Sequence, residues 1–147
     1  MVIHHPVPRI QASDGAGGPY DRAMAPPMQF EHCRPSIEVG DLAAALAFLT
    51  DVVGFTAFVV EGEPPVFAIV GEDAAQIGLV EVDGPARPDG AACYVTMRGL
   101  DELIERLAEA GVPLDVPLTE RPWGLRDIVV TLPGDGPMLA FGEHIGP

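Results

Sequence analysis

A single tryptophan stands at the mouth of a predicted β-hairpin, where it could bind an aromatic ligand. Trp123 lies between Pro122 and Gly124, just before two short apolar runs. A large flat ring in such a turn can close a cavity or stack on a ligand. It can equally be a packing anchor, because tryptophan is highly buried on average. The sequence leaves both roles open. The predicted hairpin consists of the runs Asp127–Leu132 and Met138–Phe141, joined by the turn Pro133–Pro137.

Side chains that could support covalent catalysis are scarce. The chain has four histidines, and two of them, His4 and His5, form an N-terminal pair too short to predict a metal site. Little general-base capacity is left near Ser36 or Cys93, and no Gly-rich phosphate loop of the required spacing occurs. Cys33 and Cys93 form neither a disulfide framework nor a spaced metal cluster, so we expect buried free thiols. Covalent catalysis is not predicted.

The charge balance restricts the possible partners. The 147 residues include 22 acidic and 8 basic side chains, a net charge of −14. This charge argues against binding nucleic acid through its phosphates and favours cationic partners. An acidic surface can also serve only to keep a protein in solution. No apolar run approaches the roughly 18 to 20 residues that cross a bilayer, and the N-terminus lacks a basic region followed by an apolar core. We therefore expect a cytoplasmic protein that does not bind membranes.

The first half of the ordered chain predicts a strand, a helix and three more strands. Residues 1–29 show no apolar period and predict an irregular or flexible arm, whereas residues 30–147 predict one domain. Ile37 and Val39 alternate with polar residues, as in a strand, and Asp41 is placed to cap a helix. The apolar face of that helix is Leu42, Leu46, Leu49 and Val53, with Gly54 as its end. The strands that follow are predicted at Phe55–Val60, Val66–Val70 and Ala75–Val82.

The second half repeats this pattern. A linker, Gly84–Gly90, with two prolines and two glycines, separates module 1 (about 30–83) from module 2 (about 91–147). Module 2 has a predicted strand at Cys93–Met97, a helix at Gly99–Gly111 and a strand at Val112–Leu118, before the hairpin. Such an internal repeat predicts an α+β fold of paired βαβββ modules, whose curved sheets enclose a cleft.

Three segments resemble the vicinal oxygen chelate superfamily of glyoxalases, extradiol dioxygenases and bleomycin-resistance proteins. "SIEVGDLAAALAFLTDVVGF" resembles its opening strand and helix. "VTMRGLDEL" and "RPWGLRDIVVTLPGDGPMLAFGE" resemble the second helix start and the terminal hairpin of the bleomycin-resistance branch. The similarity spans roughly residues 30–144, but Leu49 replaces a usual aromatic residue and "LPGDGP" replaces the customary "DPDGN" turn. The resemblance implies paired βαβββ modules and a homodimer with ligand clefts shared between subunits.

Metal-binding members of this superfamily hold a divalent ion with His, Gln or Glu on the first and last strand of each module. The resemblance places Arg34, Gly78, Ala92 and Ala140 at those positions. Arginine is a permanent cation, and glycine and alanine carry no donor atoms. We therefore expect no metal and no other cofactor. A relocated site would use His32 or the pair Glu143 and His144, but adjacent residues on a strand point to opposite sides.

The resemblance and the charge together predict a protein that sequesters a cationic, partly aromatic antibiotic of the bleomycin type in an acidic cleft at a dimer interface. The alternative is a metal-dependent lyase or oxygenase with a relocated metal site. We expect Arg34, if it lies in the cleft, to pair with a carboxylate such as Glu38 or to bind an anionic group of a ligand, because an unpaired buried cation is costly. Glu38, Tyr94 and Thr96 share strand parity with Arg34 and Ala92, so we expect them to face the same cleft. The predicted ligand-binding residues are Trp123, Glu38, Tyr94, Thr96 and Arg34, with Phe58 and Phe67 as weaker candidates that could also be core residues.

Overall fold

The computed structural model describes residues 24–134 and 136–146. The chain divides into two units, Met1–Glu31 and His32–Pro147. In the first unit, residues 25–31 form neither helix nor strand. His4, His5 and most of the predicted arm lie outside the described residues. No helix of the described chain is long and apolar enough to cross a membrane.

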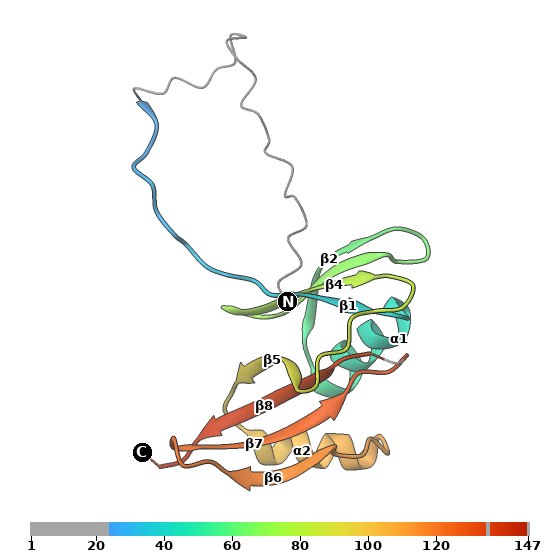
Figure 1. Cartoon of the computed structure of the whole chain (residues 1–147), viewed down its shortest axis with the longest axis vertical. Coiled ribbons are helices and arrows are strands. Elements are labelled where there is room, and N and C mark those ends of the chain that lie inside the picture. The colour runs from blue at the N-terminus through green and yellow to red at the C-terminus, as the bar shows by residue number, and fades with distance from the viewer. Residues whose placement is uncertain (1–23, 135, 147) are drawn as a thin grey trace. The chain divides into compact units, whose positions relative to one another are not determined.

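The second unit contains two four-stranded mixed sheets, each accompanied by one helical segment, so the prediction of an α+β fold with paired βαβββ modules is confirmed (Figure 1). The strand order is β1-β4-β3-β2 in the first sheet and β5-β8-β7-β6 in the second. In each sheet the first and last strands of a module are parallel neighbours, and the other pairs are antiparallel. The elements of module 1 are β1 (Ser36–Val39), α1 (Leu42–Ala47), η2 (Phe48–Val53), β2 (Thr56–Glu61), β3 (Phe67–Glu72) and β4 (Ala75–Glu81). Those of module 2 are β5 (Ala91–Thr96), α2 (Leu100–Glu109), β6 (Val116–Glu120), β7 (Leu125–Thr131) and β8 (Met138–His144).

The helical segment of module 1 begins and ends where the sequence predicts. The Asp41 carboxylate accepts a hydrogen bond from the Ala44 amide at 3.0 Å and so caps α1. The predicted single helix is α-helical only to Ala47 and continues as the π-helical turn η2. It ends at Gly54, whose φ of 93° is readily adopted by glycine.

The helix of module 2 is capped from another strand. Gly99 precedes α2 with a φ of 82° and has no side chain to accept a hydrogen bond. The Glu143 carboxylate of β8 takes that role and accepts from the Gly99 amide at 2.8 Å. The cap therefore ties the start of α2 to the last strand of the sheet on which it packs.

Two predicted boundaries are wrong by three residues or more. The strand predicted at Val112–Leu118 is β6, which runs from Val116 to Glu120. Its predicted first residue instead closes the end of α2, because the Val112 amide donates to the Leu107 carbonyl at 2.9 Å. The hairpin is also longer than predicted, since β8 continues to His144, which pairs with Leu125. Glu143 and His144 therefore belong to β8 instead of following it.

One apolar core joins the helical segments to one face of each sheet. This inner face is defined by nearly inaccessible residues: Ile37, Val39, Ala68, Val70, Ile77 and Leu79 in the first sheet, and Ile128, Val130, Leu139 and Phe141 in the second. The aromatic rings of Phe55 and Phe141, one from each module, lie 6.5 Å apart between centroids. Because strand residues alternate in direction, the intervening residues lie on the outer faces of the two sheets. Those outer faces hold the candidate site.

Candidate ligand-binding site

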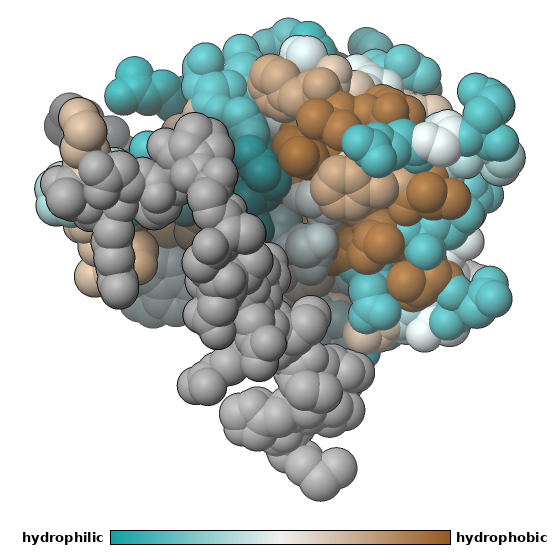
Figure 2. Space-filling model, turned by 90° about the horizontal axis from the view of Figure 1, so that it is seen from above, coloured by the Kyte–Doolittle hydropathy of each residue, from teal (hydrophilic) through white to brown (hydrophobic). Residues whose placement is uncertain are grey.

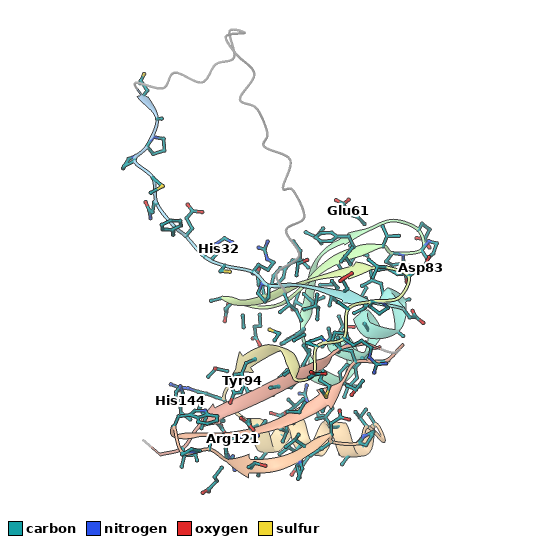
Figure 3. All side chains as sticks on the ribbon, viewed as in Figure 1. His32, Glu61, Asp83, Tyr94, Arg121 and His144 are labelled. Atoms are coloured by element: carbon teal, nitrogen blue, oxygen red, sulfur yellow. The ribbon has the colours of Figure 1, made fainter. Side chains whose placement is uncertain are left out.

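Tyr94 and Thr96 lie on the outer face of the second sheet, as their strand parity predicts. In the parallel pairing of β5 with β8, Tyr94 is opposite Ala140 and Thr96 is opposite Gly142. Their neighbour Val95 is buried on the inner face. Figure 3 shows Tyr94 on the same sheet as Arg121, which comes from the turn between β6 and β7.

A buried carboxylate on β7 connects these two residues. Asp127 is only 3% exposed and is the one buried polar or charged side chain in the described part of the chain. Its Oδ2 accepts a hydrogen bond from the Tyr94 hydroxyl at 3.1 Å, and its Oδ1 accepts from Arg121 Nε at 3.0 Å. A buried carboxylate is tolerated only where such partners compensate its lost hydration. Asp127 therefore joins β5, β7 and the β6–β7 turn.

Gly142 provides the space in which the Tyr94 side chain lies. A Cβ atom at residue 142 would overlap the Tyr94 hydroxyl and ring, so the ring crosses β8 at this glycine to reach Asp127 on β7. Burial raises the pKa of the Tyr94 hydroxyl, and the hydrogen bond to the Asp127 carboxylate raises it further. The neutral phenol, which donates to Asp127, is therefore the favoured form.

Trp123 lies in the β6–β7 turn and does not pack in the core of this chain. Its side chain is 64% exposed, which argues against the packing-anchor role that the sequence left open. The Arg121 guanidinium carbon lies 5.9 Å from the centre of the Trp123 ring, within the range of a cation–π contact. Together, Tyr94, Asp127, Arg121 and Trp123 form a connected group that we call the clamp.

A hollow of about 340 Å³ adjoins the clamp where the ends of the two modules meet. Tyr94 and Thr96 line it from β5, and Gln76 lines it from β4. The two cysteines also line it, but they are not the buried thiols that the sequence predicts. Cys33 is exposed because it precedes the first strand, and Cys93 is only partly buried, although burial raises the pKa of its thiol.

The predicted pairing of Arg34 with Glu38 is wrong. Arg34 is exposed, so it needs no buried carboxylate to balance its charge. Its Nη2 and Nε atoms donate instead to the Gln76 side-chain oxygen, at 2.9 and 3.3 Å. Glu38 lies on β1, which begins after Arg34, and is opposite Val80. Arg34 borders a second hollow, of about 240 Å³, with His32 and Gln76.

The positions at which the resemblance places metal ligands do not fit a metal here. Gly78 pairs with Ser36 on the first sheet, and Ala140 pairs with Tyr94 on the second. None of the four corresponding residues, Arg34, Gly78, Ala92 and Ala140, offers a suitable donor atom. Over residues 24–134 and 136–146, no three His, Cys, Asp or Glu side chains are grouped so that they could hold an ion.

The proposed relocated metal ligands also lie apart. Glu143 is on the inner side of the second sheet, where Arg126 Nη2 donates to it at 2.7 Å. This hydrogen bond and the one from the Gly99 amide lower the pKa of the Glu143 carboxyl. His144 is the next residue along β8, so its side chain points to the opposite face, where it is exposed. The two side chains cannot chelate one ion together.

The outer face of the first sheet is different in character. By register, it carries Val59 opposite Ile69 and Phe67 opposite Val80. All four are only partly buried. Seen from above, the molecule has apolar side chains gathered in one patch with hydrophilic residues around it (Figure 2). Carboxylates adjoin this apolar face by register, Glu38 beside Val80 and Glu61 beside Phe67.

The seven predicted ligand-binding residues therefore fall into separate groups. Tyr94, Thr96 and Trp123 belong to the second sheet and its turn, and Arg34 is linked to their hollow through Gln76. Glu38 and Phe67 lie on the outer face of the first sheet. Phe58 is half exposed at the bulge of β2. The sequence reasoning missed Arg121 and Asp127, although a lone carboxylate within the apolar run of β7 was a usable signal.

Comparisons with known proteins agree with this fold. The family model described as "Glyoxalase/Bleomycin resistance protein/Dioxygenase superfamily" matches residues 29–141. A superfamily member from Sphaerobacter thermophilus DSM 20745 is 26% identical, with a TM-score of 0.63 over 80% of this chain and 98% of its own. TioX from Micromonospora sp. ML1 is 21% identical and has a TM-score of 0.61, and the match covers 80% of this chain and 98% of TioX. A lactoylglutathione lyase from Agrobacterium tumefaciens is 21% identical and has a TM-score of 0.60, and the match covers 80% of this chain and 96% of the lyase. No curated protein matches the sequence.

Proposed function

Because the chain belongs to the glyoxalase/bleomycin resistance protein/dioxygenase superfamily, we propose that it is a small-molecule binding protein of the bleomycin-resistance type. It would sequester a cationic, partly aromatic antibiotic and so keep the drug from its target. No metal or other cofactor takes part, and the chain acts by stoichiometric capture.

The observation that carries this proposal is the presence of an arginine and three small residues where metal donors are expected, with an aromatic ring beside one of them. On the second sheet, Ala140 is only 4% exposed, and its register neighbour Tyr94 extends its ring over Gly142. A tyrosine held in this way offers an aromatic surface in place of a coordination site. Trp123 adds a second exposed aromatic ring. Such rings favour flat ligands over small oxyanions or thioesters.

The charge distribution supports a cationic ligand. The net charge is −14, and the apolar outer face of the first sheet has Glu38 and Glu61 beside it. Arg121, the basic group of the clamp, is already paired with Asp127. A drug with a flat ring and a positively charged tail would satisfy both features, with the ring at the clamp and the tail near the carboxylates.

We propose a homodimer as the working form. The outer face of each sheet has no covering helix within residues 32–134 and 136–146, and the outer face of the first sheet is apolar. In a dimer the first sheet of one copy would cover the second sheet of the other, which completes the cleft. Analytical ultracentrifugation tests this directly, since a monomer at micromolar concentration would contradict it.

Calorimetric titration with metal-free bleomycin tests the function. We expect saturable heat that weakens as salt is raised, because exposed charges are screened within about 8 to 10 Å at ordinary ionic strength. A second flat cation, ethidium, tests whether recognition is broader than one drug. The absence of heat and of any thermal shift with both compounds would refute drug capture.

Elemental analysis of the purified protein separates capture from the enzymatic alternative. We expect no stoichiometric divalent ion. A tightly held ion in each chain would replace the proposal with a metal-dependent lyase or oxygenase whose ligands lie elsewhere.

A further inference from the structure

We infer that Asp127 is the positioning residue of the clamp, and that the clamp selects flat rings bearing an acceptor oxygen. Asp127 would hold Tyr94 directly and Trp123 through Arg121. This inference rests on the proposed function, because it assigns how the same site recognises its ligand.

Both carboxylate oxygens of Asp127 are engaged, each by a different arm of the clamp. Oδ2 accepts from the Tyr94 hydroxyl and Oδ1 accepts from Arg121 Nε. The Arg121 guanidinium in turn lies over the Trp123 ring. The two aromatic residues come from β5 and from the β6–β7 turn, and Asp127 is the group that connects them.

Asp127 supplies one acceptor oxygen to each arm, since the Tyr94 hydroxyl donates to one oxygen and Arg121 Nε to the other. An asparagine could keep both arms, because its oxygen could accept from Arg121 while its NH₂ group donated to the Tyr94 hydroxyl, which is also an acceptor. A leucine of similar size has no polar atom in its side chain. Asp127→Leu therefore disconnects both arms while it nearly conserves volume.

The connection matters because the rings are exposed. Tyr94 is 41% exposed and Trp123 is 64% exposed, so packing alone does not fix their orientation. Ordering a free side chain during binding reduces affinity, whereas a ring that is already held loses little entropy. Asp127 would act on affinity by holding the rings before the ligand arrives.

The unused atoms of Arg121 indicate the ligand chemistry. In the described part of the chain, its Nε is bound to Asp127, and neither Nη atom makes a hydrogen bond. A guanidinium group has five N–H donors, so several remain available beside the Trp123 ring. A flat ring that carries a carbonyl or another acceptor oxygen would stack on the tryptophan and accept from Arg121. The positive charge of the ligand would lie away from this end.

Fluorescence of Trp123, the only tryptophan of the chain, tests the positioning without any ligand. In Asp127→Leu and Arg121→Met, we expect lower anisotropy and stronger acrylamide quenching. The population of the stacked ring should fall about two- to fivefold, as loss of an exposed cation–π contact implies. Tyr94→Phe should leave both signals unchanged, because it cuts only the other arm. The control Asp115→Asn removes a carboxylate that binds Thr131 and lies outside the clamp.

Unchanged anisotropy and quenching in Asp127→Leu would overturn the positioning role whatever Arg121→Met shows, because Arg121→Met removes the cation–π contact itself. If Asp127→Leu does not fold, as circular dichroism would show, the smaller change Asp127→Ala decides the question by the same two signals. These signals need no drug, so they remain decisive even where bleomycin and ethidium give no heat and the proposed function fails.

Two flat cations test the ligand class in the folded protein. Mitoxantrone has ring carbonyls and ethidium has none, so we expect Arg121→Met to weaken mitoxantrone binding more than ethidium binding. Equal losses for both dyes, or binding of neither dye by the wild type, would overturn the acceptor-oxygen preference.

Discussion

The two sheets are built from the same module, yet their outer faces have different chemistry. The first presents partly buried apolar residues beside Glu38 and Glu61. The second presents the clamp, in which a buried carboxylate holds an arginine and a tyrosine. The apolar face can stabilise any ligand or partner of matching size by burial. The second face has directional hydrogen bonds and can therefore discriminate between ligands.

This difference indicates a division of labour between the modules. Burial of apolar surface is non-directional and contributes affinity roughly in proportion to area. Fixed donors and acceptors contribute less energy but impose an orientation. Substitutions on the second face should therefore alter selectivity, whereas substitutions on the first should alter affinity for most ligands alike.

The largest expected effect comes from removing the carboxylate on which the second face depends. Asp127→Ala leaves Arg121 and the Tyr94 hydroxyl without their shared acceptor. We expect the free energy of unfolding to fall by about 2 to 3 kcal/mol. Breaking a fully buried ion pair costs about 3 to 5 kcal/mol, and the loss is smaller here because Arg121 is partly exposed. Urea unfolding measures it. A loss no larger than that of the Asp115→Ala control, which removes an exposed carboxylate of the same module, would show that the second face does not depend on Asp127.

Gly142→Ala should disturb the same face through sterics alone. The new methyl group would overlap the Tyr94 ring, which must leave its place over β8. Overpacking of this kind costs about 1 to 3 kcal/mol. The matched change on the first sheet is Gly78→Ala, whose Cβ would lie 3.3 Å from Ser36 Oγ and needs only a small adjustment. Thermal unfolding of both variants compares them, and equal destabilisation would contradict the assigned role of Tyr94.

Trp123→Ala should affect binding and leave stability nearly unchanged, since the ring is 64% exposed. We expect bleomycin affinity to fall by about 1 to 3 kcal/mol, by analogy with bases stacked on aromatic side chains. Phe67→Ala is the counterpart on the first sheet and should lower the affinity for all ligands by a similar factor. Calorimetry with bleomycin and ethidium measures both variants. If Trp123→Ala leaves the affinity unchanged, the ligand binds elsewhere.

The smallest effect concerns the inner side of the second sheet. The hydrogen bond from Arg126 and the one from the Gly99 amide lower the pKa of Glu143 below 4.5 in the folded protein. The stability that Glu143 contributes is therefore present above pH 4.5 and is lost as the pH falls through the lower folded pKa. Glu143→Gln should reduce the fall in unfolding free energy between neutral and acid pH, measured by urea unfolding. If the variant loses as much stability in acid as the wild type does, the Glu143 carboxylate is not the cause of that loss.

Patterns with a local physical cause were predictable from the sequence. The alternation of Ile37 and Val39, the Asp41 cap and the terminal glycine Gly54 each depend on neighbours in the chain, and the structure confirms them. The repeat of these patterns was enough to indicate paired modules. Strand parity also placed Tyr94 and Thr96 on one face.

Contacts between distant strands were not predictable in the same way. Arg34 was expected to pair with a carboxylate such as Glu38 because an unpaired cation in a cleft is costly, but its partner Gln76 comes from β4. Asp127 could be identified as unusual within an apolar run, whereas its partners depend on the order of strands in the second sheet. Their identity follows from tertiary geometry, which a single sequence does not contain.

The ring of Tyr94 over Gly142 has a consequence for how this chain could change over evolution. A histidine or glutamate introduced at residue 140 would meet the neighbouring tyrosine, which is already fixed by Asp127. Metal binding at this position would then require the tyrosine to be lost before any new donor gave an advantage. That intermediate would have neither an intact clamp nor a bound ion, so we expect selection to oppose the first step.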